Sequence, residues 1–119
     1  SNKIILDAYN ANPTSMKAAL ESFALLKEPQ KTVILGDMFE LGENSVKEHQ
    51  AMADLSHDLQ FDTVFLVGKN FSRTHTESQQ FNNFEELQNH LIKTDIKEHV
   101  ILIKGSRGMQ LERAVKFLN

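Results

Sequence analysis

The feature that most restricts the fold of this chain is an alternation of short apolar runs with longer segments of helical spacing. The runs are rich in β-branched residues and stop at a glycine or a charged side chain, as buried parallel strands do. Strands that alternate with helices predict right-handed βαβ units and a mostly parallel sheet covered on both faces. We therefore expect a three-layer, Rossmann-like α/β domain with about five or six strands. The runs occupy residues 4–6, 32–35, 63–67 and 100–103, and a shorter one lies near residues 80–81.

The segments between these runs carry the signals of helix formation. Apolar residues recur three and four positions apart in the first segment, which gives that helix one apolar stripe (Met16, Leu20, Phe23 and Leu26). Residues suited to N-capping precede each expected helix, some with the spacing of a capping box. These candidate caps are Asn12 before Pro13, Ser45 with Glu48, Asn83 with Glu86, and Ser106 before a last helix.

Length and composition restrict the class of protein. A chain of 119 residues fits one domain, and 40% hydrophobic with 24% charged residues is ordinary for a globular protein. The net charge of −3 gives no basic footprint for nucleic acid, and the apolar runs are too short to span a membrane. The absence of cysteine excludes disulfides and thiolate metal sites. Residues 1–2, a Ser-Asn start, are typical of an expression-tag remnant, so we assign the domain to residues 3–119.

The first polar segment follows the first strand directly. Asp7 comes at the end of that strand, and Asn10 and Asn12 come just before a helix. A carboxylate at this place can accept hydrogen bonds from ribose hydroxyls, and amide side chains can both donate and accept. The structural alternative is that Asp7 and Asn12 only satisfy turn and cap donors. The pattern alone favours this alternative, and for Asn12 the two roles are compatible.

The second polar segment, residues 35–44, follows the second strand. Asp37 and Glu40 lie between two glycines together with Met38, Phe39 and Leu41, which are unusual in a loop unless they pack onto the sheet or a partner domain. The two carboxylates are candidates for contact with a cationic group such as a substrate ammonium. His49 lies near the start of the helix that follows. A core or surface role is the favoured interpretation of this histidine.

The third polar segment is Lys-Gly-Ser-Arg-Gly-Met at 104–109, at the end of the last strand. Glycines around Ser106 at a helix start would turn backbone N–H groups toward a ligand, and Lys104 and Arg107 add two cations. This combination suits a carboxylate or a phosphate. The spacing is not that of a P-loop, which needs Gly, four residues and then Gly-Lys-Ser/Thr.

Taken together, the three segments resemble one known family. Asp-Ala-Tyr-Asn-Ala-Asn-Pro-Thr-Ser-Met at 7–16, Leu-Gly-Asp-Met-Phe-Glu-Leu-Gly at 35–42 and Lys-Gly-Ser-Arg-Gly-Met at 104–109 are similar in order and spacing to the C-terminal domain of the Mur ligases. The likeness covers essentially the whole chain. The Tyr-Asn-Ala-Asn-Pro run resembles the branch of the family that adds D-alanyl-D-alanine.

The resemblance implies that the chain is one domain of a three-domain, ATP-dependent ligase of peptidoglycan synthesis in the bacterial cytoplasm. The N-terminal domain of such a parent holds the UDP-N-acetylmuramoyl-tripeptide, and the central domain holds the phosphates of ATP and the Mg²⁺. The third domain closes over both. The resemblance therefore implies that this chain has these two other domains as partners, is monomeric, and is inactive alone, with no catalytic residue and no metal ligand of its own.

The resemblance also assigns residues. It implies that Asp7 holds the ATP ribose and that Asn10 and Asn12 lie near the nucleotide. It implies that Lys104, Ser106 and Arg107 face the incoming dipeptide, with Asp37 and Glu40 as further contacts.

Two other classes remain open from the sequence. One is a stand-alone receiver-like or ligand-binding α/β module, because Asp7, Asp37 and Lys104 imitate the acidic residues and lysine of a receiver. The second acidic residue beside Asp7 that a receiver needs is not found. The other is a sister ligase such as folylpolyglutamate synthase, whose C-terminal domain is similar in fold but should lack the Tyr-Asn-Ala-Asn-Pro run.

Overall fold

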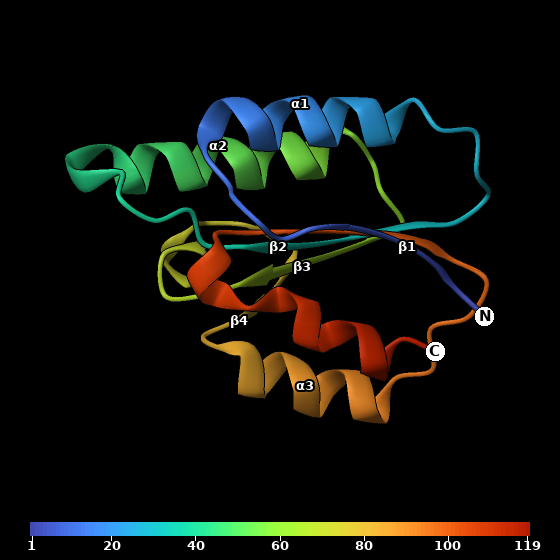
Figure 1. Ribbon diagram of the computed structural model, residues 1–119. Helices are drawn as coiled ribbons and strands as arrows, with labels where there is room; N and C mark the ends of the chain where they lie inside the picture. Colours follow the sequence, from blue (N-terminus) through green and yellow to red (C-terminus); the bar gives the residue numbers. More distant parts are fainter.

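The apolar runs form five parallel strands in a single sheet with the order β1-β5-β2-β3-β4. A computed structural model describes all residues, 1–119. It confirms the expected three-layer α/β fold, with α1 and α2 on one face of the sheet and α3 and η4 on the other (Figure 1). The strands are β1 (Lys3–Asp7), β2 (Lys31–Gly36), β3 (Thr63–Val67), β4 (Gln79–Phe81) and β5 (Val100–Lys104).

The helices fill the connections between the strands. The α-helices are α1 (Pro13–Ala24), α2 (Ser45–Asp58) and α3 (Phe84–Lys93). Short 3₁₀ helices are η1 (Gly42–Asn44), η2 (Phe71–Arg73), η3 (Arg107–Met109) and η4 (Leu111–Phe117). None of the helices has the length and apolar composition that a bilayer crossing requires.

Two hydrophobic clusters, one on each side of the sheet, explain why the strand sequences are continuously apolar. In β2, Val33 and Leu35 belong to the cluster under α1 and α2, whereas Ile34 belongs to the cluster over α3 and η4. Successive side chains of a strand point to opposite faces, so a strand covered on both sides must be apolar at every position. The edge strand β1 differs, because Ile5 and Leu6 are 41% and 48% exposed.

The capping predictions succeed for two helices. The Asn12 side chain accepts a hydrogen bond from Ser15 N at 2.9 Å, and Ser15 Oγ accepts one from Asn12 N at 3.1 Å, which forms a capping box. The Asn83 side chain accepts from Glu86 N at 2.9 Å at the start of α3. Glu86 itself reaches back to Asn82 N, one residue earlier than a standard box.

The capping predictions fail for the other two helices. Helix α2 continues directly from η1, so Asn44 and Ser45 already have helical dihedral angles and no side chain caps the helix. Ser106 does not cap a helix either, because its hydroxyl is used by a neighbouring loop and the segment after it is a three-residue 3₁₀ turn. The expected last helix is the 3₁₀ helix η4, which begins after Gln110 in a left-handed conformation.

Asn2 is part of the packed structure. Its side chain accepts from His99 N at 3.0 Å and donates to the carbonyl oxygens of Ile96 and Leu118. These bonds join the start of β1 to the approach to β5 and to the C-terminal residues. The assignment of residues 1–2 to a tag remnant stays a prediction.

Candidate functional site

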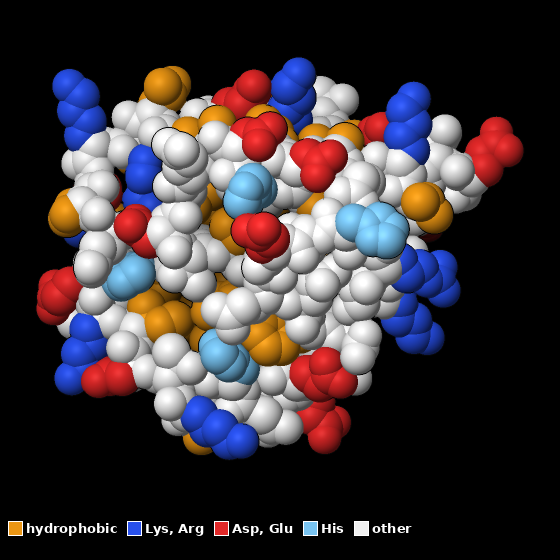
Figure 2. All heavy atoms as spheres, turned by 180° about the vertical axis from the view of Figure 1, so that it is seen from behind, with side chains coloured by type: hydrophobic (Ala, Val, Ile, Leu, Met, Phe, Trp, Pro, Cys, Tyr) orange, Lys and Arg blue, Asp and Glu red, His pale blue; other side chains and the backbone are white.

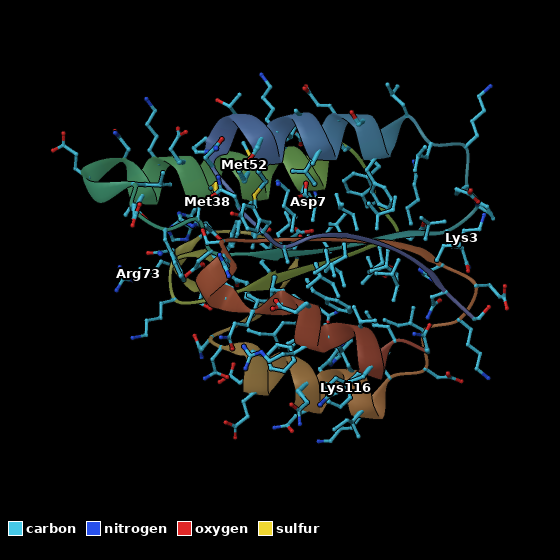
Figure 3. The ribbon with its side chains drawn as sticks, in the orientation of Figure 1. Lys3, Asp7, Met38, Met52, Arg73 and Lys116 are labelled. Atoms are coloured by element: carbon cyan, nitrogen blue, oxygen red, sulfur yellow. The ribbon has the colours of Figure 1, made fainter.

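The chain reverses its direction of travel across the sheet at β5, and this reversal creates the candidate site. Strands β1 and β2 lead into α1 and α2 on one face, whereas β5 lies between them and leads to η4 on the opposite face (Figure 1). Loops that diverge in this way leave a crevice beyond the carboxyl ends of the strands, where open α/β sheets bind ligands. All three polar segments start at this edge. Asp7 and Met38 lie toward it, whereas Lys3 lies at the other end of β1 (Figure 3).

A buried lysine links the first and third segments. Lys104 is in register with Asp7 across the β1–β5 pair, and its side chain is only 3% exposed. Its ammonium donates to Asp7 Oδ2 at 2.8 Å and to the carbonyl oxygen of Asn10 at 2.9 Å. The Asp7 side chain is half exposed, and only its Oδ2 atom has a hydrogen-bond partner within the chain. The structure therefore brings together Asp7, Asn10 and Lys104, which the sequence had assigned to two different ligands.

A second contact joins the same two loops at the surface. The guanidinium of Arg107 lies over the Tyr9 ring, 5.4 Å from its centroid, which is within the range of a cation–π interaction. Both residues are exposed, Tyr9 by 75%. They border a shallow hollow together with Leu6, Asp7 and Glu112. Tyr9 was not among the candidate residues, although an aromatic side chain inside a polar turn was a signal that could have identified it.

Asn12 has a structural role in addition to any role toward a ligand. Its Oδ1 caps α1, as described above. Its amide nitrogen has no partner within the chain, and the residue is exposed. The structural interpretation of Asn12 is confirmed, and the expected place near a nucleotide stays a prediction.

The loops after β2 and β5 are packed against each other through glycines. A Cβ atom on Gly105 would lie 2.9 Å from Cα of Gly36, so the two backbones touch at this point. A Cβ atom on Gly108 would lie 2.5 Å from the ring of Phe39. The glycines of the third segment thus serve close packing. Because η3 has only three residues, the expected anion seat at the start of a regular helix is not formed.

Ser106 is the polar link between these two loops. Its hydroxyl oxygen accepts a hydrogen bond from Phe39 N at 2.8 Å, and its own N–H donates to the carbonyl oxygen of Asp37 at 3.0 Å. The residue is buried, with 6% exposure. Ser106 is therefore positioned to hold the loop after β2, and Arg107 is the exposed polar group of the third segment.

Asp37 is buried and its carboxylate binds the turn after β3. Oδ2 accepts from Asn70 N at 2.9 Å, and Oδ1 accepts from Phe71 N at 3.0 Å. The residue is 3% exposed. This geometry favours a structural role over the expected contact with a substrate ammonium, because both oxygens already have donors and solvent barely reaches them.

His49 packs in the core beside Asp37 as a neutral imidazole. Its Nε2 accepts from Met38 N at 3.0 Å, and its Nδ1 donates to the carbonyl oxygen of Ser45 at 2.7 Å. A nitrogen that accepts a hydrogen bond carries no proton. The 3.9 Å separation between Nε2 and Asp37 Oδ1 is therefore not an ion pair. Of the two roles expected for His49, core or surface, the structure shows the core role, since the residue is fully buried and lies edge-on to Phe71.

Glu40 is the exposed carboxylate of the second segment. Its backbone has φ +64°, in the left-handed region, and its side chain has no hydrogen bond or ion pair. It lies at the rim of a hollow that also includes Phe39, Asn70 and Arg73. Of the two acidic candidates in this loop, Glu40 is the one that a ligand can reach.

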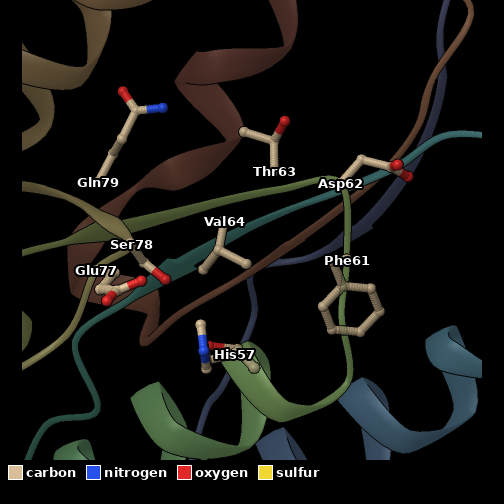
Figure 4. A pocket seen from close by; sticks show the side chains of 9 residues that line it. His57, Phe61, Asp62, Thr63, Val64, Glu77, Ser78 and Gln79 are labelled. Atoms are coloured by element: carbon tan, nitrogen blue, oxygen red, sulfur yellow. The ribbon is translucent and has the colours of Figure 1, made fainter.

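A separate hollow lies at the opposite edge of the sheet, where β3 and β4 begin. Figure 4 shows His57 and Glu77 at its wall and Phe61 at one end. Asp62, which also lines it, already accepts a hydrogen bond from Lys31 N at 2.7 Å. No ion pair lines this hollow, and its buried polar residue, Ser56, already donates to the carbonyl oxygen of Ala53. The hollow lies away from the carboxyl ends of the strands.

Charged side chains of both signs are spread over the face of the molecule that Figure 2 shows. Viewed from behind, Lys and Arg lie mainly at the margins, with Asp, Glu and His between them (Figure 2). No group of three or more His, Asp or Glu side chains is arranged to hold a metal ion.

Comparison with known sequences adds a family to this geometry. The family described as "Mur ligase, glutamate ligase domain" matches residues 1–107. A UDP-N-acetylmuramoyl-tripeptide–D-alanyl-D-alanine ligase of Rickettsia prowazekii is 38% identical over 98% of the chain, and one of Bacillus subtilis is 38% identical over 97%. The chain spans 27% of the length of each of these relatives.

Solved structures agree with the fold. A crystal structure of MurF from Acinetobacter baumannii superposes with a TM-score of 0.80 at 28% identity, over 99% of this chain and 28% of that one. The MurF ligase of Thermotoga maritima, solved in complex with ADP, superposes with a TM-score of 0.76 over 96% of this chain and 27% of that one. Its identity is 22%, so it supports the fold alone.

Proposed function

The chain belongs to the Mur ligase family, and from this premise we propose that it is the C-terminal domain of the ligase that joins D-alanyl-D-alanine to UDP-N-acetylmuramoyl-tripeptide in peptidoglycan synthesis. The observation that carries the proposal is 38% identity to two such ligases across nearly the entire chain. The receiver-like alternative is not favoured, because Asp37 is committed to the turn after β3 and Lys104 to Asp7. The sister-ligase alternative is not favoured either, because both of these relatives are named as D-alanyl-D-alanine ligases of the UDP-N-acetylmuramoyl-tripeptide.

In this proposal, ATP is bound mainly by other domains of the parent, because this chain lacks a loop for its phosphates. It has no Gly-Lys-Ser/Thr loop to bind the β- and γ-phosphates of ATP. Its His, Asp and Glu side chains form no cluster that would suit a magnesium ion. The rest of the parent, an enzyme of the bacterial cytoplasm, would hold the phosphates, the Mg²⁺ and the UDP-linked peptide. This domain would close over them and exclude water.

The nucleotide edge of the domain would be formed by the loop after β1. Asp7 offers one carboxylate oxygen that is free of internal partners, in a half-exposed position. Asn10 is exposed, and Asn12 has a free amide nitrogen beside its capping oxygen. These groups suit the hydroxyls of a ribose and the polar edge of a nucleotide.

The dipeptide seat would be formed by the loops after β2 and β5. A dipeptide has a carboxylate at one end and an amine at the other, so it needs a cation and a carboxylate as partners. Arg107 is the exposed cation of these loops and Glu40 is their exposed carboxylate. Lys104, Ser106 and Asp37 would shape the seat from beneath, because all three are buried and hydrogen-bonded.

The reaction of the parent would proceed in two steps. A carboxylate oxygen of the tripeptide attacks the γ-phosphorus of ATP, which forms an acyl phosphate and releases ADP. The dipeptide amine then attacks the acyl carbon, loses a proton and expels inorganic phosphate. This domain would contribute by holding the amine close to the acyl carbon, an effect of proximity and orientation.

A three-substrate assay of the full-length parent tests this function. We expect phosphate release only when ATP, UDP-N-acetylmuramoyl-tripeptide and D-alanyl-D-alanine are all present, and none after deletion of this domain. A matched reaction replaces the dipeptide by L-glutamate and the tripeptide by a folate. Turnover in that reaction, without turnover on the peptidoglycan substrates, would overturn the proposal in favour of the sister ligase.

A further inference from the structure

Lys104 is a buried cation whose position differs from the one its sequence motif predicts. The side chain was expected to face the incoming dipeptide, yet it is 3% exposed and points across the sheet to the loop after β1. A buried ammonium needs hydrogen-bond acceptors, because an unpaired one is strongly disfavoured. Lys104 has two, one on a side chain and one on the backbone of the adjacent loop.

These two acceptors fix different parts of the loop after β1. The bond to Asp7 Oδ2, at 2.8 Å, sets the rotation of the carboxylate. The bond to the Asn10 carbonyl, at 2.9 Å, sets the path of the backbone three residues later. Oδ1 of Asp7 is left without a partner on a side chain that is 47% exposed. The result is a pre-oriented acceptor at the mouth of the crevice.

We propose that Lys104 is a positioning residue for a vicinal diol, which it aligns by holding Asp7 and the loop after β1. This inference rests on the proposed function, in which the diol is on a nucleoside. A single carboxylate oxygen of fixed direction can accept from two neighbouring hydroxyls, so the group recognised is the 2′,3′-diol of a ribose. The parent would meet two such riboses, one in ATP and one in the UDP-linked substrate.

Steady-state kinetics of the full-length ligase with deoxy analogues tests the inference. The variants are Lys104→Met, which removes the charge at similar length, and Lys3→Met, which makes the same change on an exposed lysine of β1. The nucleotides are ATP, 2′-deoxy-ATP and 3′-deoxy-ATP. We expect the native enzyme to have a KM about tenfold lower for ATP than for either analogue. In Lys104→Met this ratio should fall to about two, and in Lys3→Met it should stay native.

A purely structural role for Lys104 gives a different result. It would raise the KM values for ATP and for both analogues by the same factor, which leaves the ratio unchanged and overturns the inference. If Lys104→Met does not fold, Lys104→Arg decides, since its retained cation can still bind Asp7. Preserved discrimination in Lys104→Arg together with its loss in Lys104→Gln supports the inference, and equal ratios in those two variants overturn it.

Two further arms separate this inference from the proposed function and identify the source of the diol. Asp7→Asn should lose discrimination among the nucleotides. If it does while Lys104→Met does not, only the role of Lys104 fails. If the KM values for all three nucleotides are equal in Asp7→Asn and also in the native enzyme, Asp7 does not bind the ribose, and this part of the proposed function is overturned. A change of KM for the UDP-linked substrate alone, in Lys104→Met, would assign the diol to that substrate and overturn the assignment to ATP.

Discussion

Gly68 packs so closely against Asp37 that a Cβ atom on the glycine would lie 2.3 Å from Cγ of the aspartate. The carboxylate fills this space because it accepts the N–H groups of Asn70 and Phe71, in the turn that follows Gly68. Gly68 also has φ +125°, which side chains rarely adopt. The loop after β2 and the turn after β3 are thus held together by an aspartate that only a glycine can accommodate.

Gly68→Ala should therefore destabilise the chain strongly. Both the backbone conformation and the contact with Asp37 oppose a methyl group, so we expect a loss of about 2–4 kcal/mol in the free energy of unfolding, measured by urea denaturation. Gly42→Ala is the matched control, because Gly42 has φ +56° with nothing within 4 Å of its added Cβ. It should lose only about 1–2 kcal/mol, the strain of the left-handed conformation. Equal losses in the two variants would contradict the role of the close contact.

The contact between Gly105 and Gly36 gives a second prediction. The added Cβ of Gly105→Ala would meet backbone atoms of β2, at 2.9 and 3.1 Å, which cannot move without displacing the strand. We expect a loss of about 1–3 kcal/mol in unfolding free energy. Gly108→Ala is the comparison, since its Cβ would meet the half-exposed ring of Phe39, which can swing into solvent. A larger loss in Gly108→Ala than in Gly105→Ala would show that this account of the two loops is wrong.

Lys31 should stabilise the end of α1. Its ammonium donates to the carbonyl oxygens of Phe23, Ala24 and Leu26, at 3.3, 2.8 and 2.9 Å. A cation at a helix C-terminus satisfies free carbonyls and opposes the negative end of the helix dipole. Lys31→Met should lower the unfolding free energy by about 1 kcal/mol, measured by urea denaturation. Lys17→Met, on the exposed face of the same helix, should have no measurable effect, and similar losses would contradict the capping role.

Asn12 allows capping to be separated from ligand binding. Asn12→Ala should lower the unfolding free energy by about 1 kcal/mol, because Ser15 N loses its acceptor, whereas Asn12→Ser should restore the cap. If the free amide nitrogen of Asn12 also contacts the nucleotide, Asn12→Ser in the full-length ligase will keep the native melting temperature and still raise the KM for ATP several-fold. A native KM in Asn12→Ser would limit the residue to capping.

The fold could be predicted from the sequence because its signals are local and repeated. The buried strands needed apolar residues on both faces, so β2 and β5 were visible as continuous runs. The cap at Asn12 was visible for the same reason, since its partner Ser15 is only three residues away. Where a short-range interaction decides the structure, the sequence contains both partners.

The arrangement of the site could not be predicted in this way, because its contacts join residues far apart in the chain. Lys104 and Asp7 were assigned to different ligands, and only the β1–β5 register places them in contact. The Ser106 hydroxyl was expected to cap a helix, but Phe39 N, 67 residues away in sequence, is a donor that local patterns do not reveal. The Asp37 carboxylate was likewise expected to contact a ligand, but it accepts hydrogen bonds from the backbone N–H groups of the turn after β3.

The last prediction concerns ATP and the isolated chain. In the proposed function, the domain offers a nucleotide only one edge, made by Asp7, Asn10 and Asn12, and the chain has no Gly-Lys-Ser/Thr loop for the phosphates, which carry most of the charge. A few exposed hydrogen bonds, each with a net contribution of about 1 kcal/mol, cannot offset the loss of translational and rotational freedom on binding. Calorimetric titration with ATP and magnesium should therefore give a Kd weaker than about 1 mM and no hydrolysis, whereas the full-length ligase binds under the same conditions. A Kd below about 10 μM, or measurable release of phosphate, would mean that the chain contains a complete nucleotide site and is not one edge of a site shared between domains.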